Sequence, residues 1–458
     1  MKSVHDLRGQ EAHAAAVEKL LASYAAIAAG SRVRLAKRTS NLFRPRAEND
    51  VPGLDVSGLD GVIAIDVEAQ TADVQGVCTY EDLVDAVLPH GFIPYVIPQL
   101  RTITLGGAVT GLGIESTSFR NGLPHESVLE MDVLTGDGTI VTATPDNEHA
   151  DLFEAFPNSY GSLGYATRLR IRLEKVPGFV ALRHVRFDDL TSASKAMADI
   201  VTSGEWHGER VDGIDGTAFT PTETYLTLAT FTDSPGPTSD YAGQDIYYRS
   251  IQQRETDRLT MLDYLWRWDT DWFWCSGAFG VQNPTVRRLW PRRWRRSDVY
   301  HRLISLDSKV GLSALLDRIK KVPGREKVIQ DIEVPVEAVP DFVEWFDEAV
   351  GMRPVWLCPL RTTRAWPTYP LRPGDIYVNV GFWGTVEVPA DHPAGGVNRL
   401  IEEKVHSLGG HKSLYSESFY DEATFRRLYG GDILDAVRAR YDADGRLSTL
   451  FEKVVRNS

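Results

Sequence analysis

The feature that most constrains this chain is a glycine-rich segment, PQLRTITLGGAVTGLGIESTSFRNG, which runs from Pro98 to Gly122. Glycine has no Cβ atom, so its backbone adopts positive φ readily and its N–H groups can approach a ligand closely. Threonine and serine hydroxyls between the glycines are further donors for phosphate oxygens. The composition fits a phosphate-binding cradle, and on glycine number alone it fits a structural loop equally well.

Two common phosphate-binding motifs do not account for the segment. A Rossmann motif places its glycines between the first strand and a helix, with an acidic residue about 20 residues further on. Here several predicted strands come first. The chain also lacks a GxxxxGK[ST] sequence.

The apolar pattern predicts an α+β fold. Residues 10–29 have helical spacing, and alternation predicts short strands over 62–67 and 72–77. Thr79 and Asp82 form a capping box for a helix through Leu88. A hairpin is expected over 128–134 and 139–143, around the turn TGDG, followed by a strand over 166–173. Pro177-Gly178 then marks a domain boundary.

Composition excludes several classes of protein. The 458 residues have the balance of a globular protein, and a net charge of -13 argues against general nucleic-acid binding. Cys78, Cys275 and Cys358 have no CxxC spacing, so neither a metal site nor a disulfide framework is expected. No apolar run approaches the ~18 residues that span a bilayer. These features favour a cytoplasmic protein.

The order of motifs resembles a known family. The segments that carry the resemblance are TLGGAVTGLGIESTS (104–118), DLFEAFPNSYGSLG (151–164), VIQDIEVP (328–335), PVWLCPL (354–360) and LYSESFYDEATF (414–425). In this order they resemble the vanillyl-alcohol-oxidase superfamily with its PCMH-type FAD-binding domain. The most similar members are the delta-24-sterol reductase family and its bacterial methylene-fatty-acyl reductase relatives.

The resemblance implies an FAD-binding domain of two α/β subdomains over 1–178 and a cap of antiparallel sheet and helices over 179–420. A C-terminal segment, 421–458, is expected to return to the FAD domain. The implied cofactor-binding residues are Lys37, Arg38, Thr39, Ser40, Asn41, Thr104, Leu105, Gly106, Gly107, Gly111, Gly113, Ile114, Ser116, Thr117, Gly161, Gly164 and Tyr165. The loop at 37–41 lacks the glycines and histidine of the superfamily's RGGGHS pattern, so we expect FAD to be bound non-covalently.

The same resemblance implies an NADPH-fed reductase of an isolated carbon–carbon double bond. Such an alkene has no neighbouring carbonyl, so a proton donor and a cation-tolerant pocket are needed. Glu115 is the first candidate donor, and the alternative is that it caps a turn or pairs with Arg120. Tyr415 and His411 are further catalytic candidates. Asp331 and Glu333 lie in the family-like segments and are weaker candidates. Aromatic residues are frequent over 266–294, where they either line a cation-tolerant pocket or pack in an ordinary core.

A basic run, VRRLWPRRWRR, lies between Val286 and Arg296 of this acidic chain. Arginine attracts anionic headgroups and tryptophan prefers the bilayer boundary, so Arg287–Arg296 is a candidate for peripheral membrane contact at the inner face of a membrane. Three other interpretations of this run remain open: a solvated basic face, a subunit interface and a binding patch for the NADPH phosphate. The membrane interpretation favours a lipid substrate. Between the two lipids implied by the resemblance, it favours a methylene-branched acyl chain of a phospholipid over a sterol.

Three classes of function stay open from the sequence. The first is the lipid alkene reductase, and the second is a flavin oxidase of an alcohol or aldonolactone. The third is a protein of flavoprotein fold without turnover.

Overall fold

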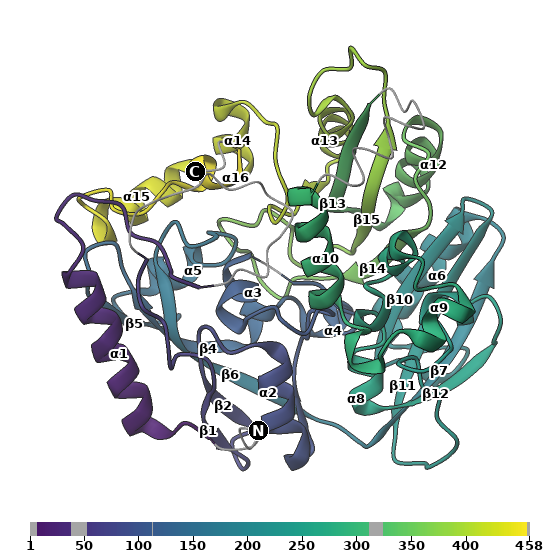
Figure 1. Ribbon diagram of the computed structural model, residues 1–458, viewed down its shortest axis with the longest axis horizontal. Coiled ribbons are helices and arrows are strands. Elements are labelled where there is room, and N and C mark those ends of the chain that lie inside the picture. Colours follow the sequence, from purple (N-terminus) through teal and green to yellow (C-terminus); the bar gives the residue numbers. More distant parts are fainter. Residues whose placement is uncertain (1–6, 38–52, 112, 311–323, 456–458) are drawn as a thin grey trace.

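The computed structural model describes residues 7–37, 53–111, 113–310 and 324–455. They form a mixture of helices and antiparallel sheets, which confirms the predicted α+β class. Two units lie side by side, one built on a six-stranded sheet and one on an eight-stranded sheet (Figure 1).

The first sheet lies in the N-terminal unit and has the strand order β1-β2-β6-β4-β5, with β3 paired to β6. Its strands are β1 (Val62–Asp66), β2 (Thr71–Gln75), β3 (Phe92–Pro94), β4 (Val128–Leu134), β5 (Ile140–Ala143) and β6 (Tyr165–Lys175). Its helices are α1 (Gly9–Ala25), α2 (Tyr80–Val87), α3 (Leu105–Gly111), α4 (Ser118–Asn121) and α5 (Ala150–Ala155). The expected hairpin is present as β4–β5, and Thr79 caps α2 by accepting a hydrogen bond from the Asp82 amide.

The second sheet belongs to the cap and has the order β12-β7-β11-β10-β14-β15-β13-β16. Its strands are β7 (Phe179–Phe187), β10 (Gly213–Thr220), β11 (Glu223–Thr232), β12 (Thr256–Thr260), β13 (Arg325–Pro335), β14 (Val355–Leu360), β15 (Tyr377–Glu387) and β16 (His411–Lys412). A separate two-stranded ribbon joins β8 (Glu205–Trp206) to β9 (Glu209–Arg210).

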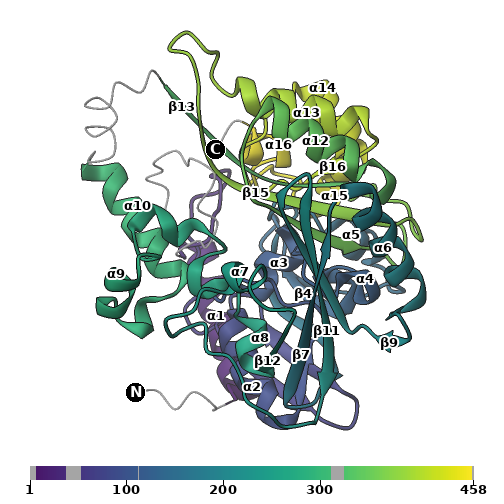
Figure 2. The same cartoon turned by 90° about the vertical axis from the view of Figure 1, so that its right-hand side faces the viewer.

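The two faces of the cap sheet differ because successive side chains of a strand point to opposite sides. On β13, Val328, Ile332 and Val334 belong to an apolar core under α6 (Leu190–Ser203), α12 (Val339–Ala349) and α13 (Gly396–Ser407). Figure 2 shows α6 and α12 on one side of the sheet and the α9–α10 region on the other. Asp331 and Glu333 alternate with the apolar residues and therefore face the other way.

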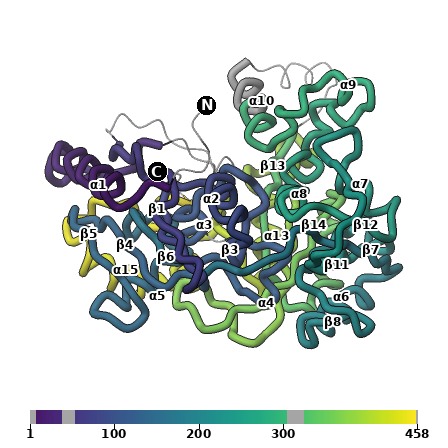
Figure 3. Tube along the Cα trace, turned by 90° about the horizontal axis from the view of Figure 1, so that it is seen from below, coloured from purple at the N-terminus to yellow at the C-terminus, as the bar shows by residue number. Residues whose placement is uncertain are grey.

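The segment between β12 and β13 carries most of the tryptophans. It contains α8 (Met261–Leu265), α9 (Pro284–Leu289) and α10 (Ser297–Val310), preceded by α7 (Tyr247–Ser250). Trp266, Trp268 and Trp272 are buried in the core shared by the two units. Seen from below, α9 and α10 project at one edge of the cap (Figure 3). Ordinary core packing therefore explains these three tryptophans.

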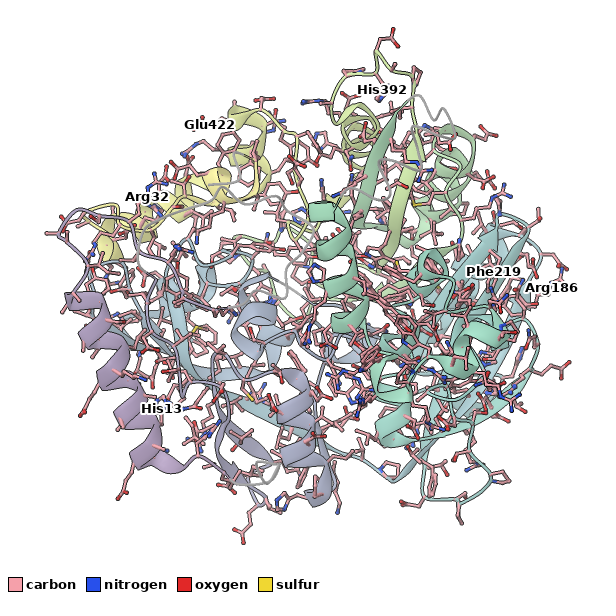
Figure 4. All side chains as sticks on the ribbon, viewed as in Figure 1. His13, Arg32, Arg186, Phe219, His392 and Glu422 are labelled. Carbon is pink, nitrogen blue, oxygen red and sulfur yellow. The ribbon has the colours of Figure 1, made fainter. Side chains whose placement is uncertain are left out.

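The chain passes from one sheet to the other between Lys175, the end of β6, and Phe179, the start of β7. Its last helices are α14 (Glu422–Leu428), α15 (Gly431–Tyr441) and α16 (Leu450–Val454). Arg440 pairs with Asp151 of α5 at 3.1 Å, and Arg32 pairs with Glu452 at 2.7 Å (Arg32 is labelled in Figure 4). The C-terminal segment thus packs on the N-terminal unit.

Among the described residues, none of the helices has both the length and the apolar character that crossing a bilayer requires.

Candidate functional site

The glycine-rich segment forms the helix α3 and is held closely by the N-terminal sheet. A Cβ added to Gly106 would lie 2.6 Å from the carbonyl oxygen of Gly76, and one added to Gly76 would lie 1.9 Å from that of Ala166. These glycines are required because three backbones meet without room for side chains. Their close packing needs no ligand to explain it.

At the start of this helix, three of the backbone amides expected in the cradle have partners within the protein. The amides of Leu105 and Gly106 donate to the carbonyls of Cys78 (2.9 Å) and Gly76 (3.0 Å). The Gly107 amide donates to the Thr104 hydroxyl at 3.2 Å. The protein itself therefore uses three of the donors that the sequence suggested for a diphosphate.

The hydroxyls further along the segment are also engaged. Ser116 Oγ bonds to the carboxylate of Glu115 and lies 2.6 Å from the hydroxyl of Tyr264. Thr117 Oγ1 donates to the Tyr95 carbonyl at 2.8 Å. Gly113 is constrained by Pro98, since an added Cβ would lie 2.6 Å from its ring. Ser116 connects the segment to the cap, whereas Thr117 and Gly113 pack within the N-terminal unit.

Other groups around α3 do fit a dinucleotide cofactor. Lys37 Nζ donates to Thr104 Oγ1 at 3.2 Å, at the start of the helix. At its far end the Tyr160 amide donates to the Thr110 carbonyl, and Lys453 Nζ donates to the Gly161 carbonyl at 2.8 Å. An ammonium and a hydroxyl together are suited to phosphate oxygens, so the residues present fit an FAD diphosphate. Arg38, Thr39, Ser40 and Asn41 lie outside the described residues.

The remaining predicted cofactor residues divide between two environments. Leu105 is buried in the core and Ile114 packs against it, whereas Gly161 and Gly164 lie in the turn before Tyr165. Gly164 has a φ of +132°, which favours glycine. The assignment of all these residues to the cofactor stays a prediction.

Glu115 belongs to a buried charge cluster that joins the two units. Its Oε1 lies 3.4 Å from Arg267 Nη1, and the same guanidinium donates to Asp215 Oδ2 at 2.9 Å. Glu115 also accepts from the Thr117 amide at 3.2 Å and from Ser116. Its partner is Arg267 of the cap and not Arg120, which pairs with Glu174.

Sequence reasoning did not find Arg267 or Asp215. Asp215 accepts from the indole nitrogen of Trp268 (2.8 Å), and Arg267 lies 4.0 Å above the ring of Tyr264. The guanidinium lies between two buried carboxylates and pairs with both. We interpret Glu115 as a member of this structural cluster.

A second buried polar cluster lies on the inner face of the cap sheet, in two rows that cross neighbouring strands. One row runs Thr217, Trp356, Gly381 and Asp331. The next runs Cys358, Asn379, Glu333 and His411. Directly opposed residues of an antiparallel sheet contact one another, so the rows form one continuous patch.

Two carboxylic acids of this patch have raised pKa values. Burial raises the pKa of Asp331 to about 7, although hydrogen bonds with Asn379 and Tyr415 act against the shift. Burial raises the pKa of Glu333 to about 8, opposed by the hydrogen bond from Ser413 and reinforced by Asp331. Near neutral pH both carboxyls therefore retain protons for a substantial part of the time.

Gly381 provides the space that this arrangement needs. A Cβ at position 381 would lie 2.4 Å from Asp331 Oδ1 and 2.6 Å from the Trp383 ring. Trp383 packs on Phe273 with ring centroids 4.3 Å apart, and on Trp274 at 5.4 Å. The acid is thus flanked by aromatic rings, two of them from the tryptophan-rich segment.

Tyr415 adjoins Asp331, whereas His411 is isolated among rings. Tyr415 accepts a hydrogen bond from Trp383 Nε1 at 2.8 Å; burial raises its pKa well above the usual value, and Asp331 and Tyr160 raise it further. His411 lies between the rings of Tyr369 and Tyr429, and burial lowers its pKa to about 3. The imidazole is therefore neutral at physiological pH.

The patch adjoins the N-terminal unit through Tyr160. The Tyr160 hydroxyl donates to the carbonyl of Gly111, the last residue of α3, at 2.6 Å. Because Tyr160 also acts on the pKa of Tyr415, the two tyrosines lie near each other across the boundary between the units. Four side-chain atoms of the patch have no hydrogen-bond partner among the described residues: Thr217 Oγ1, Glu333 Oε2, Asn379 Oδ1 and His411 Nε2. A polar ligand group would supply one.

The three cysteines are free, and no group of metal-binding side chains occurs in the described parts of the chain.

Comparison with known proteins gives the family context. Residues 12–144 match the family described as an FAD binding domain. The Delta(24)-sterol reductase of Arabidopsis thaliana is 24% identical over 447 residues, covering 87% of this chain and 76% of that protein. The Homo sapiens Delta(24)-sterol reductase is 22% identical over 419 residues, covering 86% and 76%.

A shorter match includes only the first part of the chain. Cytokinin dehydrogenase 2 of Oryza sativa subsp. japonica is 35% identical over 132 residues, or 29% of this chain and 23% of that protein. The resemblance inferred from the sequence is confirmed: the chain is an FAD-dependent oxidoreductase with an FAD-binding domain in its first third, and it is similar over most of its length to the Delta(24)-sterol reductases.

Proposed function

We propose that this protein reduces an isolated carbon–carbon double bond of a lipid, with NADPH as the electron donor. The observation that carries the proposal is a pair of carboxyls on one face of β13, half-buried Asp331 and buried Glu333, next to the ring of Trp383; burial raises their pKa values to about 7 and 8. An alkene without a neighbouring carbonyl must be protonated before it accepts hydride, and this patch offers both a retained proton and a cation-tolerant wall.

We assign the proton donor role to Asp331. Its proton passes to one alkene carbon, the π bond breaks, and a cation remains on the more substituted carbon. The faces of Trp383 and Trp356 stabilise that cation, each by roughly 0.5–2 kcal/mol. Bound FAD, its diphosphate held by Lys37 and Thr104, would supply the hydride that forms the second C–H bond. The carboxylate then regains a proton from solvent through Tyr415, so the net reaction consumes one NADPH and one proton.

The catalytic candidates have different roles in this proposal. Asp331 acts as acid: burial keeps it protonated, and hydrogen bonds with Asn379 and Tyr415 orient it. Glu115 pairs with Arg267 and so helps to hold the two units together. His411, neutral and enclosed, packs at the edge of the patch.

For the substrate we propose two lipid classes. The relatives named Delta(24)-sterol reductase favour a sterol side chain. A methylene-branched acyl chain of a phospholipid has the same isolated double bond, and both would leave a tertiary cation on protonation. A cytoplasmic location, at the inner face of a membrane, stays part of this prediction.

The purified protein with FAD provides the test. NADPH should bleach the flavin in the absence of oxygen, and either lipid should then reoxidise it while gaining two mass units. In D2O, deuterium should appear on the carbon that Asp331 protonates, and the exchangeable N5–H of the reduced flavin should place a second deuterium on the neighbouring carbon. Bleaching by an alcohol, with peroxide formed in air, would instead identify an oxidase.

Gene deletion separates the two substrates. The lipid that accumulates with its double bond intact, sterol or branched acyl chain, is the physiological one. An unchanged lipid composition would contradict the proposal.

A further inference from the structure

The basic run at 286–296 separates in the structure into a buried set and an exposed set of arginines. Arg287 is buried and paired with Asp271 at 2.7 Å. Arg295 is buried and donates to backbone carbonyls, including that of Trp290 at 3.0 Å. Arg296 donates two hydrogen bonds to Glu81, at 2.7 and 2.6 Å. These three cations hold the segment in place and are not available to a partner.

The other three arginines are exposed and alternate with exposed apolar side chains. Together they form a surface that we call the 286–294 face, made of Val286, Arg288, Leu289, Arg292, Arg293 and Trp294. Leu289 is 80% exposed and Trp294 is 45% exposed. Arg292 pairs with Asp240, whereas Arg288 and Arg293 form no ion pair with any residue in the described parts of the chain. Two full positive charges therefore lie beside large apolar groups in water.

We propose that the 286–294 face docks the protein on an anionic phospholipid bilayer. Charge complementarity selects this occupant, because free guanidinium groups attract anionic headgroups while leucine and tryptophan enter the headgroup boundary. A protein with a net charge of -13 is otherwise repelled by such a surface. A local basic face therefore also fixes which side of the molecule approaches the bilayer.

A cavity beside this face adds to the cationic character. Its volume is about 760 Å³, and its lining has four arginines, Arg254, Arg288, Arg292 and Arg295, against two carboxylates, Asp240 and Asp245. Asp240 pairs with Arg292 and Asp245 with Arg254, so Arg288 is the guanidinium left for a headgroup phosphate at this opening. The cavity belongs to the surface of the cap and not to the buried acid patch.

The face is linked to the acid patch by a single stretch of chain. Trp294 contacts Trp290 at 6.1 Å, and Trp290 stacks with Tyr300 of α10 at 6.3 Å. Earlier in the same stretch, Trp274 packs on Trp383 beside Asp331. Docking would thus attach to the bilayer the same segment that contributes Trp274 to the aromatic wall of the proposed site.

Vesicle sedimentation with the FAD-loaded protein tests the proposal without turnover, so its outcome is distinct from that of the proposed function. The protein should sediment with vesicles of equal parts phosphatidylcholine and phosphatidylglycerol. It should bind pure phosphatidylcholine weakly and be released at about 1 M salt, where the screening length is about 3 Å. Equal binding to both vesicles, or binding that salt does not weaken, overturns the proposal.

Two double variants locate the contact. Arg288→Ala with Arg293→Ala should lower partitioning about 25-fold, since each charge contributes about fivefold. Leu289→Ser with Trp294→Ser should lower it on the same vesicles. The matched control is Arg186→Ala with Leu400→Ser, which changes an exposed arginine and an exposed leucine elsewhere; Arg186 is labelled at the far edge of the cap in Figure 4. The control should bind as the unmodified protein does.

Other occupants give other results. If the arginine variant raises the KM for NADPH and leaves vesicle binding intact, the face is a nucleotide-phosphate site and the proposal is wrong. If the leucine–tryptophan variant converts a dimer into a monomer without affecting vesicle binding, the face is a subunit interface and the proposal is equally wrong.

Discussion

Asn379 Nδ2 donates a hydrogen bond to Asp331 Oδ1 at 3.2 Å, from β15 to its neighbour β13. The amide fixes the carboxyl in the gap that Gly381 leaves open, next to the ring of Trp383. This contact orients a carboxylic acid in an aromatic environment on the side of the cap that meets the FAD-binding domain.

Asp331→Asn should abolish proton donation while keeping the shape of the site. We expect kcat to fall by about 10²–10⁴-fold, the usual contribution of a general acid, with little change in KM. In the unmodified protein, activity should decline as pH rises through the pKa of about 7. Glu333→Gln is the companion variant and should reduce kcat less. A fully active Asp331→Asn would remove this residue from the mechanism.

The same carboxyls should make folding stability depend on pH. Their folded pKa values are raised, so their contribution is complete below the unfolded pKa of about 4 and is lost as pH rises through about 7 and 8. As pH rises from the unfolded pKa to the folded pKa of a group, that group lowers the free energy of unfolding by at most about 1.4 kcal/mol per pH unit.

Urea unfolding of the unmodified protein and of Asp331→Asn with Glu333→Gln measures this effect. The difference between the two isolates the carboxyls from buried histidines, whose lowered pKa values act in the opposite direction. Identical slopes in the two proteins would show that both acids are ionised in the folded state.

Arg267→Met should destabilise the protein strongly, because Glu115 and Asp215 would remain buried without their cation. We expect a loss of about 3–5 kcal/mol in unfolding free energy. Arg302→Met, which removes an exposed arginine paired with Asp298, should cost little. Adding Glu115→Gln and Asp215→Asn to Arg267→Met should recover part of the loss, whereas no recovery would mean that packing, not charge, dominates.

Gly106→Ala should disturb the junction of α3 with the sheet. The new Cβ would lie 2.6 Å from the Gly76 carbonyl, and we expect a cost of about 1–3 kcal/mol together with weaker FAD loading. Thermal unfolding and the flavin absorbance of the purified protein report both effects. Gly178→Ala, at a glycine with no atom within 4 Å of the added Cβ, should behave as the unmodified protein.

Local signals predicted the elements that depend on nearby residues. Thr79 caps its helix because the cap is made within four residues, and the β4–β5 hairpin follows from its own turn. The glycine-rich segment differed: it was expected as a loop and forms α3. Its first amides pair with carbonyls at Gly76 and Cys78, contacts that no local pattern reveals.

The site was only partly predictable for the same reason. Acidic residues at 331 and 333, two apart in one strand, indicate one shared face, and that signal was present in VIQDIEVP. Which of several acids keeps its proton depends on distant partners. Arg267 reaches Glu115 across 152 positions of sequence, and only the folded chain brings them together.

The pairing of Arg296 with Glu81 has a mechanical consequence. Glu81 starts the helix α2 of the FAD-binding domain, and Arg296 directly follows the exposed 286–294 face; Arg101 reinforces the clamp through Glu81 and Asp269. A force applied to the face is thus transmitted straight to the domain that carries the flavin. These ion pairs therefore join the segment that carries the face to the FAD-binding domain, so that the face and the flavin are connected by a short path through Glu81.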